Sequence, residues 1–166
     1  MINIIVVVFL SLYLSGCASS MIDAAQANNL AQIDVALAVD ALAQNDPLMA
    51  KAKLLSALQL APDSPSVQAA WGYYLWRVGD VASADQAYAR ALSLAPDDPQ
   101  IEDDYAAFLY HQQHYAQALP YFVKAASNEN YLYTGLAYQN ASLTASHLGD
   151  AKLAALYQQK ALAESE

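Results

Sequence analysis

Small and apolar residues recur every 34 residues along most of this 166-residue chain. The segments 57–63 (ALQLAPD) and 91–97 (ALSLAPD) agree at six of seven positions, and Pro65 and Pro99 repeat at the same spacing. Alanine supplies 35 residues, against 5 glycines and 6 prolines. Alanine favours the helix more than any other residue. A repeat of this length and composition predicts an array of helices and argues against a β-sandwich or barrel.

Four repeat units can be placed over residues 31–164, at about 31–64, 65–98, 99–132 and 135–166. Positions 8 and 20 of each unit are small, and position 24 of the first three is large and apolar. The residues at positions 8 and 24 of those three units are Ala38, Gly72, Ala106, Leu54, Tyr88 and Phe122. This pattern resembles the tetratricopeptide family, whose repeat is a pair of antiparallel helices. The resemblance implies an all-α, right-handed superhelix of about four helix pairs that bury their apolar faces by stacking.

The N-terminus carries a different pattern, an uninterrupted apolar run over residues 4–14. Eleven residues are too few for a permanent membrane span, which needs about 20, but they suit the core of a secretory signal. The following Leu14-Ser15-Gly16-Cys17 resembles the bacterial lipobox. That resemblance implies a signal peptide over 1–16, lipidation of Cys17 and a lipidated tether over 17–30. Ala18, by the bacterial sorting rule, implies the periplasmic face of the outer membrane of a Gram-negative bacterium.

Composition narrows the classes of function. The chain carries 16 acidic and 7 scattered basic residues, a formal charge of −9, which disfavours a nucleic-acid partner because binding phosphates needs clustered cations. A single cysteine excludes an internal disulfide. No phosphate-binding loop or nucleophile motif is present, and His111 and His114 lack a third metal ligand in the sequence. We therefore expect no enzyme, metal, cofactor or small-molecule substrate, with an enzyme of unrecognised chemistry as the alternative.

The tetratricopeptide resemblance implies where a partner would bind. The first helix of each repeat, here called the A helix, lines a concave groove in this family, and its positions 2, 5, 9, 12 and 13 face the ligand. Carried onto this sequence, the candidate groove residues are Tyr73, Trp76, Arg77, Asp103, Tyr110, His111, Leu143 and His147. Aromatic residues contribute much of the binding energy at interfaces. The alternative is that aromatics at helical spacing pack in the core.

Several segments resemble one group of bacterial tetratricopeptide lipoproteins, the PilF/PilW pilotins of type IV pilus biogenesis. They are 104–109 (DYAAFL), 112–119 (QQHYAQAL), and 140–143 (NASL) followed by Gly149-Asp150. The resemblance implies an outer-membrane lipoprotein that binds the pilus secretin and aids its localisation and multimerisation. The alternative is a scaffold lipoprotein of the same fold that serves a tight-adherence pilus, outer-membrane protein insertion or peptidoglycan enzymes.

Overall fold

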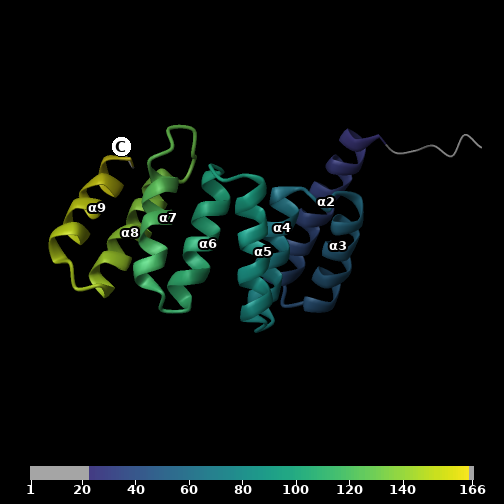
Figure 1. The fold of residues 1–166 in the computed structure, drawn as a ribbon, viewed down its shortest axis with the longest axis horizontal. Coiled ribbons are helices and arrows are strands. Elements are labelled where there is room, and N and C mark those ends of the chain that lie inside the picture. The colour runs from purple at the N-terminus through teal and green to yellow at the C-terminus, as the bar shows by residue number, and fades with distance from the viewer. Residues whose placement is uncertain (1–22, 165–166) are drawn as a thin grey trace, which may run out of the picture.

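The computed structural model describes residues 23–164, which form eight helices in four antiparallel pairs (Figure 1). The expected all-α fold of helix pairs is confirmed, and the described residues include no strand. The helices are α2 (Ala24–Ala43), α3 (Pro47–Leu60), α4 (Pro65–Arg77), α5 (Val81–Leu94), α6 (Pro99–His111), α7 (Tyr115–Ala126), α8 (Thr134–His147) and α9 (Ala151–Ala163). The A helices are α2, α4, α6 and α8, and the B helices are α3, α5, α7 and α9.

Each pair reverses direction at one residue with a left-handed backbone. These residues are Asn45, Gly79, Gln113 and Gly149, with φ between 59° and 89°. Glycine adopts this conformation without steric cost, which explains the two Gly-Asp turns. An aspartate follows in three of the turns, and its carboxylate accepts a hydrogen bond from the amide three residues later, as Asp80 does from Ser83 at 3.2 Å. Such caps satisfy amides at the start of a helix that have no partner within it.

The first helix begins earlier than the repeat pattern predicted. Asp23 accepts a hydrogen bond from the Gln26 amide at 2.7 Å and caps α2, which starts at Ala24. Residues 17–30 were assigned to the tether, with part of that segment able to extend the first helix, and residues 24–30 do extend it, by about two turns before the first repeat. The predicted signal peptide, Cys17 and residues 17–22 of the predicted tether lie outside the described residues.

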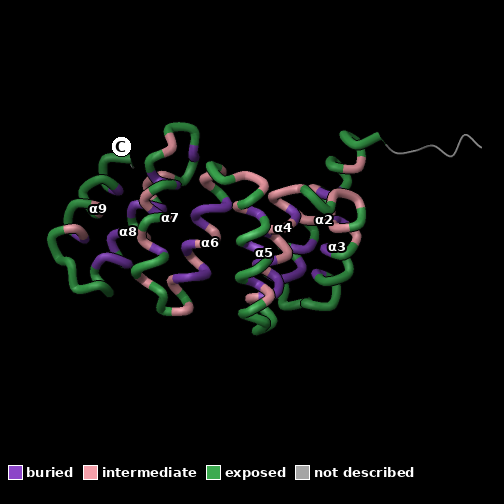
Figure 2. Tube along the Cα trace, in the orientation of Figure 1, coloured by how far each residue is buried: buried purple, intermediate pink, exposed green. Residues whose placement is uncertain are grey.

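The core lies between the two helices of each pair and between neighbouring pairs, where Figure 2 shows the buried residues. Leu54, Tyr88 and Phe122, all at repeat position 24, are almost fully buried. Gly72 lies against the Tyr88 ring, and a Cβ atom on Gly72 would come within 3.0 Å of that ring. The small residues of the repeat are therefore a packing requirement, since the rings occupy the space that larger side chains would need.

The A helices lie side by side and form one face of the array. Helix α2 contacts α4, α4 contacts α6, and α6 contacts α8, while each B helix packs on its own A helix. This arrangement brings side chains from four separate segments onto a common surface. None of the described helices combines the length and apolar character that a membrane crossing requires.

Candidate binding groove

The face built by the A helices is hollowed by two cavities. The first lies between α2, α4 and α6 and has a volume of about 630 Å³. Its walls are mostly small and apolar, and its polar side chains include two carboxylates. The apolar lining residues are Val35, Val39, Ala69, Ala70 and Ile101, and the polar ones are Ser66, Tyr73, Asp98, Gln100 and Asp104. A pocket with apolar walls and a few polar groups is the usual form of a binding site.

The second cavity is smaller, about 170 Å³, and lies between α6, α7 and α8. It is lined by Ala107, Tyr110, His111, Phe122, Asn140 and Leu143. Leu143 is 49% exposed although it is a large apolar side chain. An exposed leucine beside a cavity provides apolar surface that a partner can cover, and that burial is favourable.

A chain of aromatic and imidazole rings runs along the C-terminal ends of α4, α6 and α8. The centroid of Trp76 lies 5.9 Å from that of Tyr73 and 5.0 Å from that of His111. Tyr110 continues the chain at 5.8 Å from His111 and 5.4 Å from His147. These distances are typical of interacting ring pairs. The rings thus form a continuous strip across three repeats.

Most of the predicted groove residues come together on this face. Tyr73 lines the first cavity, and Tyr110, His111 and Leu143 line the second. Arg77 donates a hydrogen bond to the Tyr73 hydroxyl at 2.8 Å, and its guanidinium lies 5.6 Å from that ring's centroid. Their role in binding a partner stays a prediction.

Trp76 combines the two alternatives that the sequence left open. Its ring is partly exposed, but it also packs edge-on against the buried Phe108, with centroids 6.1 Å apart. The indole therefore contacts the core at Phe108 and also belongs to the ring strip.

Asp103 does not line the groove, contrary to expectation. It is 8% exposed, and its Oδ2 accepts a hydrogen bond from the Tyr131 hydroxyl at 3.1 Å. Burial raises the pKa of Asp103, and the Tyr131 hydrogen bond partly opposes this shift. Tyr131 belongs to the loop between α7 and α8, which covers Asp103. The third repeat has Asn130 where Pro62 and Pro96 stand in the first two units, and this departure was the available signal for an altered loop.

Asp104, the next residue, lines the first cavity and was missed by the sequence analysis. Burial raises its pKa to about 6, and the negative charges of Asp103 and Asp98 add to the shift. The Gln100 side-chain amide donates a hydrogen bond to Asp104 at 3.1 Å and acts in the opposite direction. The cavity therefore contains a carboxylate whose charge is poorly solvated.

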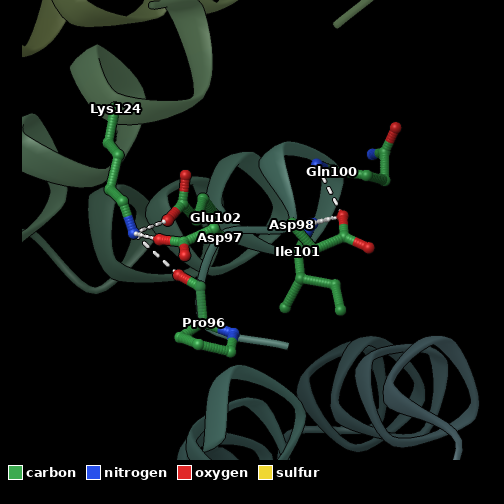
Figure 3. A network of polar contacts seen from close by, with 7 residues as sticks. All are labelled: Pro96, Asp97, Asp98, Gln100, Ile101, Glu102 and Lys124. Atoms are coloured by element: carbon green, nitrogen blue, oxygen red, sulfur yellow. Dashed lines mark hydrogen bonds and ion pairs between the residues drawn. The ribbon is translucent and has the colours of Figure 1, made fainter. Parts of the chain in front are cut away.

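Asp97 and Glu102 form a second acidic site near the start of α6, where their charges are balanced by Lys124. This site holds α7 against the start of α6. Figure 3 shows Lys124 of α7 reaching Asp97, Glu102 and the Pro96 carbonyl on one side, and Asp98 with Gln100 and Ile101 on the other. Asp98 caps α6 by accepting hydrogen bonds from the Gln100 and Ile101 amides. Within residues 23–164, no group of three or more histidine, aspartate or glutamate side chains is placed to hold a metal ion.

Comparison with solved structures places this geometry among known folds. PilF of Pseudomonas aeruginosa superimposes with a TM-score of 0.79 at 22% identity, over 83% of this chain and 62% of that one. PilW, described as a widely conserved type IV pilus biogenesis factor, superimposes with a TM-score of 0.77 at 24% identity. The match covers 83% of this chain and 63% of PilW. The chain has a tetratricopeptide-repeat fold that resembles PilF and PilW.

The same tetratricopeptide-repeat arrangement occurs in MamA, with a TM-score of 0.68 at 20% identity, over 85% of this chain and 81% of that one. The chain spans less than two thirds of the length of the PilF and PilW structures. No protein-family profile and no curated protein matches the sequence. At these identities the likeness establishes the fold, and the expected tetratricopeptide resemblance is confirmed at that level.

Proposed function

We propose that the protein is an outer-membrane lipoprotein whose A-helix groove binds a protein partner and assists assembly of the type IV pilus secretin. The likeness to PilF and to PilW, a type IV pilus biogenesis factor, gives this proposal its main support. The lipobox-like sequence before Cys17 supports the membrane address. The action is non-covalent: acyl chains hold the protein on the membrane, and the groove raises the local concentration of secretin subunits.

A second candidate function is a scaffold for another envelope complex. The likeness to MamA favours this scaffold function. The match covers 81% of the MamA chain, against 62% of the PilF chain. Such a scaffold would serve a tight-adherence pilus, outer-membrane protein insertion or peptidoglycan enzymes. It shares the fold, groove and lipid anchor with the first proposal and differs only in the partner.

We expect Leu143→Glu to weaken partner binding at the second cavity. The substitution places a carboxylate where a partner would cover apolar surface, and burying an unpaired charge is strongly unfavourable. The measurement is affinity purification of the lipidated protein from detergent-solubilised membranes, with recovered proteins identified by mass spectrometry. Secretin recovered with the wild type is expected to fall about tenfold with Leu143→Glu, as for loss of a residue that matters at an interface.

Leu55→Glu is the matched control, because Leu55 is 44% exposed but belongs to α3, a B helix. It introduces the same charge outside the groove and is expected to leave secretin recovery unchanged. Recovery of insertion machinery or cell-wall enzymes without secretin would exclude the pilus proposal and favour the scaffold. Equal recovery with both variants would exclude the second cavity as the contact surface.

We expect Cys17→Ser to release the protein from the membrane. Serine lacks the thiol that lipidation requires, and without its acyl chains the protein loses the anchor that we propose. The measurement is fractionation of cells that express each form, followed by immunoblotting of the periplasmic and outer-membrane fractions. Retention of Cys17→Ser in the outer-membrane fraction, at the wild-type level, would contradict the lipoprotein assignment.

A further inference from the structure

The first cavity suggests the chemistry of the segment that occupies the groove. Its walls are apolar, yet the charged residues that line it are Asp98 and Asp104, and no basic residue is among its lining. An occupant with only apolar groups would leave these carboxylates without a partner as it excluded water. Such an occupant would therefore bind poorly, because desolvating an unpaired charge is unfavourable.

Each carboxylate keeps the capacity to accept a further hydrogen bond. In Asp104, Oδ1 accepts from the Gln100 side chain at 3.1 Å. In Asp98, Oδ1 accepts from the Gln100 and Ile101 amides at 3.0 and 3.2 Å. No hydrogen bond within the described part of the chain uses either Oδ2 atom. Arg77, on the same helix as the lining residue Tyr73, donates its hydrogen bond to the Tyr73 hydroxyl at 2.8 Å.

We infer that the first cavity accepts a lysine or arginine side chain from a protein segment lying in the groove. The aliphatic stem of that side chain would lie against Val35, Ala70 and Ile101, and its charged end would meet Asp104 and Asp98. Long basic side chains combine an apolar stem with a charged end in this way. The inference rests on the proposed function only in that the groove binds a protein segment.

The electrostatics of Asp104 support this occupant. Burial raises the pKa of Asp104 to about 6, and the ionisable groups that interact with it are Asp103, Asp98, Tyr88 and Tyr131. Because this pKa exceeds the ordinary value of about 3.9, the free protein loses stability as the pH rises from about 4 to about 6, and at pH 7 the ionised Asp104 is destabilising. A cation in the cavity would relieve that unfavourable charge and lower the pKa.

The test uses two capped peptides, Ala-Val-Arg-Val-Ala and the same peptide with neutral citrulline in place of arginine. Binding is followed at pH 7 by NMR, from methyl shifts of the residues that line the first cavity. We expect the arginine peptide to shift the Val35, Val39 and Ile101 methyls, and the citrulline peptide to bind about tenfold more weakly, as on loss of a charge-assisted hydrogen bond. Equal affinity for both peptides, or shifts confined to other residues, would overturn the inference.

Asp104→Asn is expected to weaken binding of the arginine peptide by about tenfold for the same reason. Asp85→Asn is the matched control, since Asp85 lies on helix α5 and its remaining oxygen can still accept the Tyr105 hydrogen bond. Thermal unfolding provides a separate measurement. At pH 7 we expect Asp104→Asn to unfold at a higher temperature than the wild type, because asparagine carries no charge. A lower unfolding temperature combined with unchanged peptide affinity would identify Asp104 as purely structural.

The two proposals can fail separately. If wild type and Asp104→Asn recover secretin equally from membranes, the pilus function stands and the basic-residue inference is wrong for that partner. If the arginine peptide binds as expected but no secretin is recovered, the cavity chemistry stands and the pilus function is wrong.

Discussion

Phe108→Ala is expected to lower the free energy of unfolding by about 4 kcal/mol, the range for truncating a buried phenylalanine. Phe108 is 2% exposed, and its ring lies 5.5 Å from Tyr88 and 6.0 Å from Tyr105. It joins the core of the second repeat to that of the third, so the cavity left by the substitution weakens the junction between them. Denaturation by urea, followed by circular dichroism, measures the loss.

The same substitution is expected to affect the groove, because Trp76 packs edge-on against Phe108. Loss of this support would change the near-ultraviolet signal of the indole even where the helices remain folded. Tyr133→Ala is a suitable control, since Tyr133 is 54% exposed and lies in the loop before α8. If Phe108→Ala lowered the free energy of unfolding by less than about 1 kcal/mol, the scale of an ordinary substitution, the place of Phe108 in the core would be contradicted.

Lys124→Met is expected to destabilise the protein by about 2 kcal/mol near pH 7. Lys124 forms ion pairs with Asp97 at 2.9 Å and with Glu102, and it donates to the Pro96 carbonyl at 2.7 Å. Glu102 is 1% exposed, so removing its cation leaves a buried carboxylate without charge compensation. Breaking a fully buried pair typically costs about 3–5 kcal/mol, and the value here is lower because the Lys124 side chain is 51% exposed.

The sign of the pH dependence follows from Glu102. Burial raises its pKa, and Lys124 opposes that shift, so loss of Lys124 raises this pKa further. The folded variant then binds the Glu102 proton more tightly than the unfolded chain does. The difference in free energy of unfolding between the variant and the wild type therefore narrows as the pH falls. Urea denaturation at pH 7 and pH 5 measures this trend.

Two variants separate the Glu102 pair from a general effect of charge. Adding Glu102→Gln to Lys124→Met is expected to recover part of the loss at pH 7, because it removes the uncompensated charge. Lys51→Met is the control, since Lys51 is exposed on α3 and no described ion pair includes it. Suppose that Lys124→Met lowers the free energy of unfolding equally at both pH values and that Glu102→Gln restores none of it. The effect of Lys124 would then come from packing of its aliphatic stem and not from its charge.

The sequence predicted the fold because its repeat encodes local geometry. Gly72 and its counterparts mark the close crossings, the rings at position 24 mark the core, and Gly-Asp pairs mark turns that require a left-handed residue. These are properties of one repeat or of two neighbours, so they recur at a fixed spacing. The early start of α2 depends instead on the single cap formed by Asp23, which lies outside the periodic pattern.

The candidate groove was predictable only in part. Tyr73, Tyr110 and Leu143 follow from the position of the A helices, and the structure places them beside the two cavities. The exchange of roles between Asp103 and Asp104 was not predictable, because it depends on Tyr131 reaching back 28 residues from a loop that departs from the repeat. The ring strip depends likewise on the rotation between repeats, which sets distances such as that between Tyr110 and His147.

The side-by-side arrangement of the A helices has a mechanical consequence. Within the described part of the chain, no helix contacts a helix beyond the neighbouring repeat, so the curvature of the whole array is a sum of small rotations at its junctions. In arrays of this kind a small change of rotation at each junction adds up to a large displacement of one end relative to the other, while every repeat stays folded. If the proposed lipid anchor holds one end of the array at the membrane, such rotations would let the groove follow a moving partner.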